Sequence, residues 1–293
     1  MGPLIIATIG KKGGIGKTTL TFHLSGLLGD MGVRVLLVDT DRSASLSNIF
    51  EIRRRAPYGF TQVVTRGVAS EDCVSTTHFQ NVDLVCSDDD KDDLRSWLMG
   101  RFDALSRLRT ALRNPFISSS YDVIFIDTQG APGPVQNTCI MAADTLLCPV
   151  VPDILSAREF IESAYDLIEN LESAASAGAR VPGRIVTVLY RHEDKVTDAR
   201  RTAEMIRLEH LKLRGKVDLL ETVVPASVTY REAISEKIPA HLHETKRPPT
   251  KAGIEPAFVV THHLVWELFP NYNGVFASGG LLGDMVQETV HAP

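Results

Sequence analysis

Short apolar runs alternate along the chain with longer segments in which apolar residues recur at helical spacing. The short runs predict strands at residues 4–8, 33–38, 82–86, 123–126, 145–149, 185–189 and 219–224. The longer segments predict helices over residues 18–31, 91–113, 156–177, 196–213 and 253–268. Because the predicted strands are apolar without alternation, both of their faces are expected to be buried, as in a parallel sheet covered by helices. The pattern predicts an α/β fold, doubly wound, with a mostly parallel sheet and helices on both faces.

The expected domain organisation follows from where this alternation stops. Residues 1–247 are expected to form the core, and the run Lys246-Arg247-Pro248-Pro249 marks its boundary because paired prolines interrupt regular structure. Residues 248–270 are expected to form a C-terminal helical segment that packs on the core. Residues 271–293 are glycine-rich at their start and are expected to form a mobile tail.

Composition narrows the class of protein. The chain has 293 residues, of which 44% are hydrophobic, so it can bury a large core. No apolar run approaches the roughly 20 residues that span a bilayer, and Lys11 and Lys12 follow the short first run at once, so neither a membrane span nor a signal peptide is expected. The four cysteines lie far apart without a C-x-x-C pair, which argues against a disulfide framework or a thiolate metal site and suits a reducing cytoplasm.

Charge is distributed unevenly along the chain. The net charge of −5 argues against coating of nucleic acid by bulk charge alone. Between residues 180 and 216, however, there are ten Lys and Arg and five Asp and Glu, a local excess of 10 − 5 = +5. This excess fits phosphate contacts without sequence preference, whose affinity falls steeply as salt rises.

The sharpest motif lies between the first predicted strand and the first predicted helix. It reads Lys-Lys-Gly-Gly-Ile-Gly-Lys-Thr-Thr from Lys11 to Thr19. Glycines let successive backbone N–H groups turn towards one anion, and the start of the helix adds its dipole. In such a loop Lys17 reaches the β- and γ-phosphates of a nucleotide, and the Thr18 hydroxyl ligates Mg²⁺. The predicted nucleotide-binding residues are Lys12, Gly13, Gly14, Ile15, Gly16, Lys17, Thr18 and Thr19.

Two carboxylate motifs follow later predicted strands. Asp39-Thr40-Asp41 comes after residues 35–38, and Asp127 comes after residues 123–126. Open α/β sheets bind their ligands at the carboxyl ends of the strands, so these side chains are expected to share one site with the glycine-rich loop. A single aspartate at a strand end more often caps a turn, but three motifs in this order favour a nucleotide site.

Together these motifs resemble the deviant Walker A ATPases, the group that contains the ParA/Soj partition proteins, the MinD division-site proteins and the nitrogenase iron protein. In that group the lysine at the position of Lys12 crosses a dimer interface and adds positive charge at the partner's nucleotide. The resemblance implies ATP and Mg²⁺ as cofactors and Lys12, Lys17 and Asp41 as catalytic residues, with Asp41 orienting the attacking water. It also implies that Asp39 supports the metal and Lys12, that Asp127 holds Mg²⁺ through water, and that the backbone amide of Gly130 senses the γ-phosphate.

The chain departs from the family pattern beside two of these residues. Arg42-Ser43 follow Asp41 where the family often has Pro-Gln, and Gln129-Gly130 follow Thr128 where it often has Pro-Pro. The departures concern the switch segments and leave the expected nucleotide loop intact.

Later segments favour the partition branch of the family. Residues 142–150 and 223–226 resemble the strands that lead to its base-binding loops, and residues 228–239 resemble the following region of plasmid and mobile-element ParA proteins. The resemblance implies a cytoplasmic, nucleoid-associated ATPase in which Mg-ATP closes a homodimer that binds double-stranded DNA without sequence preference. A centromere-binding ParB-like partner then stimulates the hydrolysis that releases the DNA. The candidate DNA contacts are Arg191, Arg200, Arg201, Arg207, Lys212, Arg214, Lys216 and Arg231.

Other branches of the family fit these residues less well. The nitrogenase iron protein needs cysteines close behind its Walker B motif, whereas Cys139 comes twelve residues after Asp127. MinD ends in a basic amphipathic helix that lies on the membrane, whereas residues 271–293 contain no Lys or Arg, so no stable membrane association is expected. Only three residues precede the first predicted strand, so an operator-reading domain ahead of it is not expected either. Two alternatives stay open: a ParA-like ATPase that positions a protein cargo, and a MinD-like regulator at a membrane surface.

One acidic run invites a different interpretation. Residues 88–93 contain five aspartates, but they open a predicted helix, where negative charge favours the helix dipole. The run is therefore interpreted as a helix start, and no metal besides Mg²⁺ is predicted.

Overall fold

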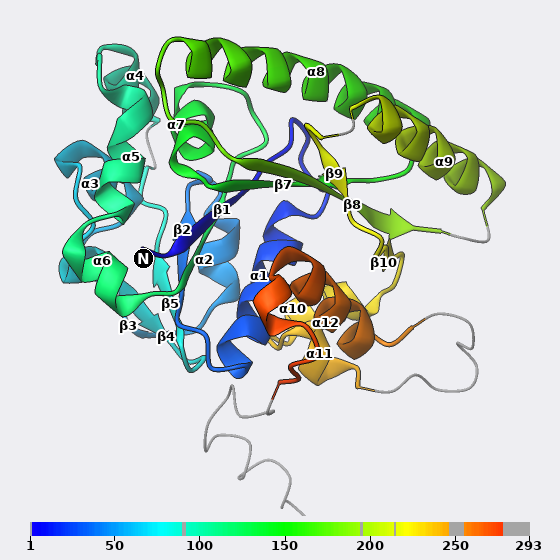
Figure 1. Ribbon diagram of the computed structural model, residues 1–293. Helices are drawn as coiled ribbons and strands as arrows, with labels where there is room; N and C mark the ends of the chain where they lie inside the picture. The colour runs from blue at the N-terminus through cyan, green and yellow to red at the C-terminus, as the bar shows by residue number, and fades with distance from the viewer. Residues whose placement is uncertain (1, 90–91, 194–195, 214, 246–254, 278–293) are drawn as a thin grey trace, which may run out of the picture.

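The strands form one mixed sheet in the computed structural model, which describes residues 2–89, 92–193, 196–213, 215–245 and 255–277 (Figure 1). The strands are β1 Leu4–Thr8, β2 Val35–Asp39, β3 Ile52–Arg54, β4 Ser75–Thr77, β5 Val82–Val85, β6 Val123–Asp127, β7 Thr145–Val150, β8 Arg184–His192, β9 Asp218–Leu219 and β10 Val224–Pro225. Their order is β10-β8-β7-β1-β6-β2-β5-β4-β3, with β9 also beside β8. Every pairing from β10 to β5 is parallel, whereas β4 pairs antiparallel with β3 and β5. The predicted α/β, mostly parallel fold is confirmed.

Helices cover both faces of the sheet. They are α1 Lys17–Asp30, α2 Ser45–Ile49, α3 Phe60–Arg66, α4 Asp93–Met99, α5 Ala104–Leu112, α6 Pro115–Ser120, α7 Pro134–Ala142, α8 Ile154–Ser176, α9 Thr197–Lys212, α10 Thr229–Ser235, α11 Ala240–His243 and α12 Ala257–Leu268. Successive strand residues point to opposite faces: Leu36 and Val38 pack with α3 to α8, while Val35 and Leu37 pack with α1, α2 and α10 to α12. None of the helices within the described ranges combines the length and apolar character that crossing a bilayer requires.

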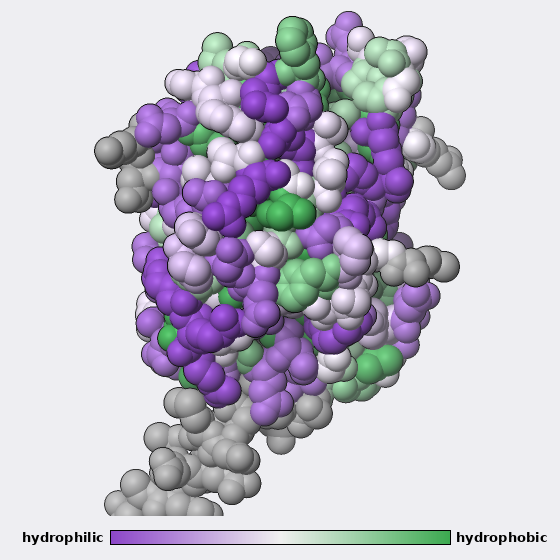
Figure 2. All heavy atoms as spheres, turned by 90° about the vertical axis from the view of Figure 1, so that its left-hand side faces the viewer, coloured by the Kyte–Doolittle hydropathy of each residue, from purple (hydrophilic) through white to green (hydrophobic). Residues whose placement is uncertain are grey.

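The structure corrects the predicted helix over residues 91–113. Two helices, α4 and α5, occupy the described part of this stretch, and Lys91 lies outside the described residues. Gly100 follows the end of α4, as is common at helix C-termini. Because of this break, both helices bury apolar side chains on the same face of the sheet as α7. Phe102, between the two helices, is fully exposed. Figure 2 views the molecule from this side and shows a mostly polar face with small apolar patches.

The predicted strand over residues 219–224 is also corrected, because β9 and β10 occupy only its ends. The carboxylate of Glu267 on α12 accepts hydrogen bonds from the backbone N–H groups of Glu221, at 2.7 Å, and Thr222, at 2.8 Å. These two donors therefore bond to a helix side chain and not to a neighbouring strand.

The acidic run marks helix starts, as its pattern predicts. Asp88 accepts hydrogen bonds from the backbone N–H groups of Gly59 and Thr61 at the start of α3, and Asp89 accepts one from that of Asp93 at the start of α4. Asp90 lies outside the described residues. Across the described ranges, no group of three or more His, Cys, Asp or Glu side chains is arranged to hold a metal ion.

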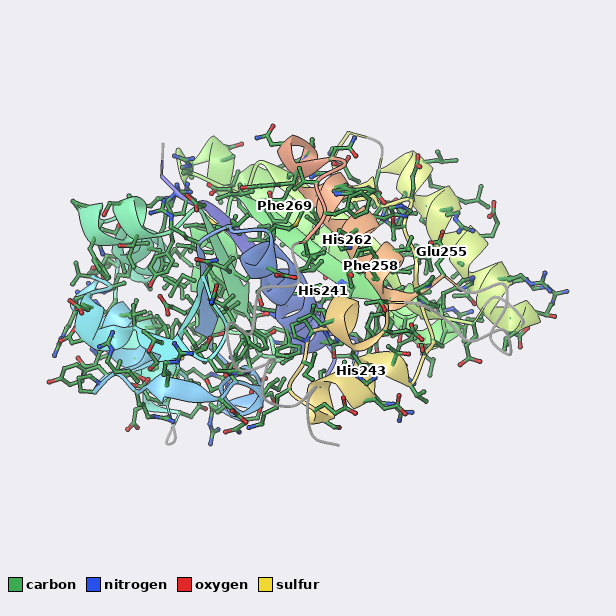
Figure 3. The ribbon with its side chains drawn as sticks, turned by 90° about the horizontal axis from the view of Figure 1, so that it is seen from below. His241, His243, Glu255, Phe258, His262 and Phe269 are labelled. Atoms are coloured by element: carbon green, nitrogen blue, oxygen red, sulfur yellow. The ribbon has the colours of Figure 1, made fainter. Side chains whose placement is uncertain are left out.

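Histidines join the C-terminal helices to α1. His241 Nε2 on α11 lies 3.1 Å from Asp30 Oδ2 on α1, and both side chains are fully buried. The backbone N–H of Ala240 donates to His23 Nδ1 at 3.1 Å, and His262 on α12 completes the cluster (Figure 3). These contacts hold α12 on the face that α1 covers. The proposed domain boundary at residues 246–249 lies outside the described residues, as does most of the expected tail.

Acidification is expected to destabilise the protein through His23. Burial lowers the pKa of His23 from 6.5 to about 3, so below pH 6.5 the unfolded chain takes up a proton that the folded chain does not. The free energy of unfolding should then fall by about 1.4 kcal/mol per pH unit from this residue. Urea denaturation of wild type and His23→Gln between about pH 7.5 and 5 measures the effect. The glutamine carbonyl preserves an acceptor for Ala240, and two parallel pH profiles would contradict the prediction.

Candidate nucleotide-binding site

The glycine-rich loop lies between β1 and α1 at the carboxyl edge of the sheet. Gly14, with φ +76°, and Gly16, with φ +101°, adopt the left-handed backbone conformation that L side chains avoid. A methyl group built on Gly14 meets no atom within 4 Å, so the space in front of the loop is open. A methyl group on Gly16 would lie only 2.5 Å from the ring of Tyr190. Glycine is required at position 16 both by the backbone conformation and by this neighbour.

Lys17 lies across this loop. The residue is only 7% exposed, and Nζ donates a hydrogen bond of 2.9 Å to the carbonyl oxygen of Lys12. Burial lowers the pKa of Lys17, while the negative charges of Asp127 and Asp41 oppose that shift. A bound phosphate would favour the charged ammonium in the same way, so the position suits phosphate binding.

Asp39 and Asp127 lie side by side because β2 and β6 pair in register. Both are fully buried, and burial raises the pKa of each carboxyl group. Asp39 Oδ2 accepts hydrogen bonds from the backbone N–H and hydroxyl of Ser47 on α2, at 2.8 and 2.7 Å. Asp41 is only partly buried and accepts from the backbone and hydroxyl of Ser43. Asp39 therefore fixes α2 and the segment that carries Asp41.

The side chains of Thr18 and Asp127 fit a hard cation. The Thr18 hydroxyl donates to Asp127 Oδ2 at 2.7 Å, whereas Oδ1 is buried without a hydrogen-bond partner among the described residues. Burial raises the pKa of Asp127 to about 7, and the charge of Asp39 adds to that shift. Mg²⁺ takes oxygen ligands and is commonly held by one or two protein side chains plus phosphates and water. This oxygen pair beside the loop matches that pattern.

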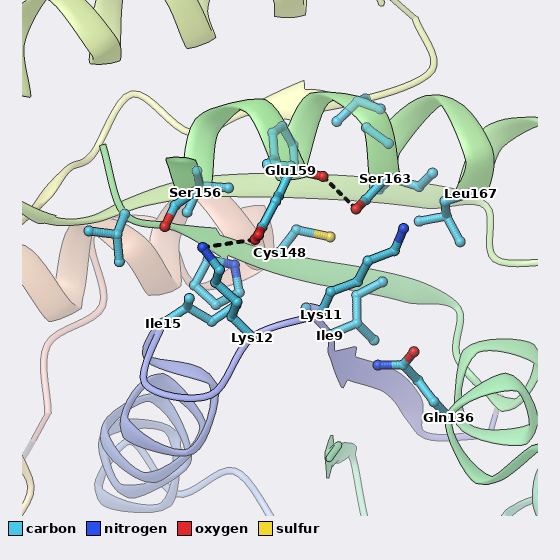
Figure 4. A pocket seen from close by; sticks show the side chains of 18 of the residues that line it. Ile9, Lys11, Lys12, Ile15, Gln136, Cys148, Ser156, Glu159, Ser163 and Leu167 are labelled. Atoms are coloured by element: carbon cyan, nitrogen blue, oxygen red, sulfur yellow. Dashed lines mark hydrogen bonds and ion pairs between the residues drawn. The ribbon is translucent and has the colours of Figure 1, made fainter. Parts of the chain in front are cut away.

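The two lysines at the start of the loop point outward onto α8. Lys12 Nζ forms an ion pair with Glu159 Oε2 at 2.9 Å, and its side chain is 40% exposed (Figure 4). Lys11 Nζ lies 3.5 Å from Asp166 Oδ2. Between these pairs and the sheet is an apolar pocket lined by Ile9, Ile15, Ile140, Phe160 and Leu167, among others. Its apolar lining does not suit phosphate.

Gly130 follows β6 closely enough to contact the loop. A methyl group on Gly130 would lie 3.1 Å from the carbonyl carbon of Lys12 and 3.2 Å from the nitrogen of Gly13. Next to it, the carbonyl oxygen of Gln129 accepts a hydrogen bond of 3.2 Å from Gln136 at the start of α7. The backbone at position 130 is therefore packed directly against the glycine-rich loop.

The basic candidates divide into two groups. Arg207, Lys212 and Lys216 pair with the carboxylates of Glu204, Glu209 and Glu172, at distances from 2.6 to 3.6 Å. The second group is exposed and makes no ion pair within 4.0 Å with any carboxylate that the structure describes: Arg191, Arg200, Arg201 and Arg231. Arg214 lies outside the described residues.

Three residues at the site were not found from the sequence. Ser47 holds Asp39, Glu159 holds Lys12, and Tyr190 packs on Gly16. The hydroxyl of Ser47 follows Asp39 by eight residues, and only the turn into α2 brings the two together. Glu159 and Tyr190 lie near the loop because of the order of the strands in the sheet, and the spacing of residues in the sequence does not reveal that order.

Comparisons with known proteins identify the family and the fold. A family model described as an AAA domain matches residues 4–177. The sporulation initiation inhibitor protein Soj of Bacillus subtilis is 24% identical over 243 residues, which cover 83% of this chain and 92% of Soj. Other matching proteins are named as chromosome-partitioning and as plasmid-partitioning proteins.

Solved structures agree in fold. An ATP complex of McdA from Cyanothece has a TM-score of 0.68 at 20% identity, covering 90% of this chain and 96% of that one. MinD of Pyrococcus horikoshii with Mg-ADP has a TM-score of 0.63 at 21% identity, covering 92% and 98%. The fold, with its loop at the sheet edge, is that of a P-loop ATPase. The chain belongs to the family of AAA-domain ATPases that the family model describes, and it is similar to the partition proteins Soj and ParA.

Replacing Asp127 with Asn is expected to stabilise the nucleotide-free protein and to remove its stabilisation by Mg-ATP. The pKa of Asp127 is raised from 3.8 to about 7, so ionisation opposes folding as the pH rises between these values. Above that range the variant should gain between about 1 and 4 kcal/mol in free energy of unfolding, because one pKa unit corresponds to about 1.4 kcal/mol. Urea denaturation at about pH 5 and pH 8, with and without Mg-ATP, measures both effects.

Asp41→Asn is the matched control for loss of one carboxylate charge, because Asp41 is only partly buried. Without nucleotide, its free energy of unfolding at pH 8 should rise less than that of Asp127→Asn, because the Asp41 side chain is not fully buried. An Asp127→Asn protein that is less stable than wild type at pH 8 would show that the buried carboxylate does not oppose folding.

Proposed function

We propose that this ATPase is a ParA-type DNA-partition ATPase of the cytoplasm that associates with the nucleoid. Mg-ATP drives formation of a homodimer that binds double-stranded DNA without sequence preference, and hydrolysis stimulated by a ParB-like partner releases the DNA. The observation that carries the proposal is that two lysines of one loop point in different directions. Lys17 is buried across its own phosphate loop, whereas Lys12 points out of the loop and is available to a second subunit.

The proposed chemistry is phosphoryl transfer from ATP to water. Lys17 and the backbone N–H groups of residues 13–19 bind and orient the β- and γ-phosphates. Asp41, tethered by Ser43 and placed beside Asp39, orients the attacking water. Thr18 and Asp127 would hold Mg²⁺, with Asp39 supporting from the adjacent strand. When bound, the ion supplies positive charge that offsets the charge on the phosphates.

Dimer formation requires Lys12 to leave Glu159. The ion pair is half-exposed, and exposed pairs contribute no more than about 1 kcal/mol, so a nucleotide of another subunit competes easily for this lysine. The charge of Lys12 then falls where the transferring phosphoryl group is most negative. In the absence of nucleotide, Glu159 keeps the lysine away from its own loop.

The proposed DNA surface consists of the exposed basic side chains on β8, α9 and α10. Arg200 and Arg201 lie in the first turns of α9, Arg191 lies near the end of β8, and Arg231 lies on α10. They are better candidates than Arg207, Lys212 and Lys216, whose charges are offset by neighbouring carboxylates. Phosphate contacts of this kind depend on charge and not on base sequence.

Lys12→Ala is expected to lose ATP-dependent dimerisation and at least about tenfold in hydrolysis rate, because a trans-acting charge in phosphoryl transfer commonly contributes 10³-fold or more. Sedimentation and phosphate release with Mg-ATP measure the two effects. Lys11→Ala is the matched control, since Lys11 is adjacent and also pairs with α8. A Lys12→Ala protein that dimerises and hydrolyses ATP like the control would exclude the trans-lysine mechanism.

DNA binding is expected only with Mg-ATP. The logarithm of the association constant should fall linearly with the logarithm of the salt concentration. The double variant Arg200→Ala/Arg201→Ala should weaken binding to unrelated duplexes equally and reduce the salt slope by up to about 2, because each lost phosphate contact removes about 0.9. Lys212→Ala should change both the DNA affinity and the salt slope less, because Glu209 already offsets the charge of Lys212. Fluorescence anisotropy with ATP, ADP and no nucleotide provides the measurement.

The same titration separates the alternatives. Absence of DNA binding by wild-type protein in every nucleotide state would favour cargo positioning or membrane-surface regulation. Co-sedimentation with anionic vesicles in Mg-ATP would then identify the membrane regulator.

A further inference from the structure

A buried tyrosine near the end of β8 separates the phosphate loop from two exposed arginines. Tyr190 is 5% exposed, and the next residue, Arg191, is exposed with φ +57°. That left-handed conformation is uncommon for any residue but glycine, and it turns the chain immediately beyond the ring. The arginine is therefore held in a specific orientation relative to Tyr190.

On one side, the ring of Tyr190 packs against the nucleotide loop. A methyl group built on Gly16 would lie within 2.5 to 2.7 Å of three ring carbons, so the glycine backbone is already in contact with the ring face or edge. Burial raises the pKa of Tyr190, and the Thr19 side chain in the first turn of α1 opposes that shift. The ring thus contacts the residue directly before Lys17.

On the other side, Tyr190 is joined to the strand that leads to α10. Val224 of β10 pairs with Tyr190, and the N–H of Ala226 donates to the carbonyl of His192 at 3.0 Å. Five residues after Ala226 comes Arg231 on α10, and Arg191 directly follows Tyr190 on β8. One buried side chain is therefore linked to both exposed arginines.

We infer that Tyr190 is a positioning residue that couples occupancy of the phosphate loop to the orientation of Arg191 and Arg231. That the two arginines bind DNA rests on the proposed function. The coupling between the loop and the two segments that carry the arginines does not depend on it. A phosphate that takes Lys17 away from the carbonyl of Lys12 changes the backbone between them. Packed interiors transmit such a shift and do not absorb it, so the ring moves the end of β8 and, through the paired strand, the start of α10.

The test compares Tyr190→Leu with Tyr190→Phe and with a matched control, Tyr121→Leu. Tyr121 is similarly buried, but it precedes β6 and therefore lies at the amino ends of the parallel strands, away from the nucleotide loop. Hydrogen exchange of residues 187–193 and 226–235 is measured with and without saturating Mg-ATP, and duplex DNA affinity is measured with saturating ATP and ADP. Saturation removes any change in nucleotide affinity from both comparisons.

In wild type and Tyr121→Leu, Mg-ATP is expected to change exchange in both segments and to raise DNA affinity at least tenfold over ADP. Tyr190→Leu should lose the exchange response in both segments, and its ATP-to-ADP affinity ratio should fall to within about threefold of one. Tyr190→Phe, which keeps the ring, should restore both.

Two outcomes overturn the inference. One is a Tyr190→Leu protein that keeps the exchange response and the affinity ratio of wild type. The other is a Tyr190→Phe protein that fails as fully as Tyr190→Leu although both bind Mg-ATP. If wild type binds no DNA but shows the exchange response, the proposed function fails while the exchange comparison still decides the role of Tyr190.

Discussion

The contact between Thr18 and Asp127 determines how the rest of the site is arranged. It joins the first turn of α1 to the end of β6, and it leaves one buried carboxylate oxygen without a partner among the described residues. A buried carboxylate in this situation is unfavourable unless a cation or a proton compensates it. The pairing of β6 between β1 and β2 adds Asp39 beside it and so increases the demand for positive charge. The two buried aspartates concentrate negative charge at this point, and Mg²⁺ bound with a nucleotide would offset it.

The same electrostatics separates the two lysines of the loop. Lys17 is drawn inward, where Asp127 and Asp41 favour its charged form against the effect of burial. Lys12 finds its carboxylate on the outside, at Glu159 of α8. A single loop thereby presents one cation to its own phosphates and another to its surroundings. The ordinary P-loop pattern, G-x-x-x-x-G-K-[ST], has glycine where this chain has Lys11, and both Lys11 and the following Lys12 pair with carboxylates of α8.

Much of this arrangement could be predicted from the sequence, and the failures have physical causes. Apolar runs identified β1, β2, β6, β7 and β8, because strands buried on both faces need apolar residues, and also β5, although Asp83 interrupts its run. Short edge strands such as β3, at Ile52–Arg54, carry no such signal. The position of Asp39 beside Asp127 followed from the rule that ligands bind at carboxyl ends of strands. Glu159 and Tyr190 could not be found, because their approach to the loop depends on strand order and helix placement.

The end of the family model lies between the nucleotide site and the strand that carries Tyr190. The family model covers residues 4–177, which contain the loop, both buried aspartates and Glu159, and it ends before β8. All of the basic residues considered for DNA lie beyond that point. A nucleotide-dependent surface therefore has to be connected to the ATPase core by contacts that cross this boundary. Tyr190 makes such a contact directly on the phosphate loop, while Tyr230 of α10 makes a second through His23 of α1, at 5.5 Å between ring centroids. Both run from α1 and its loop to the segments that carry Arg191 and Arg231, so the glycine-rich loop and the proposed DNA surface share their supporting contacts.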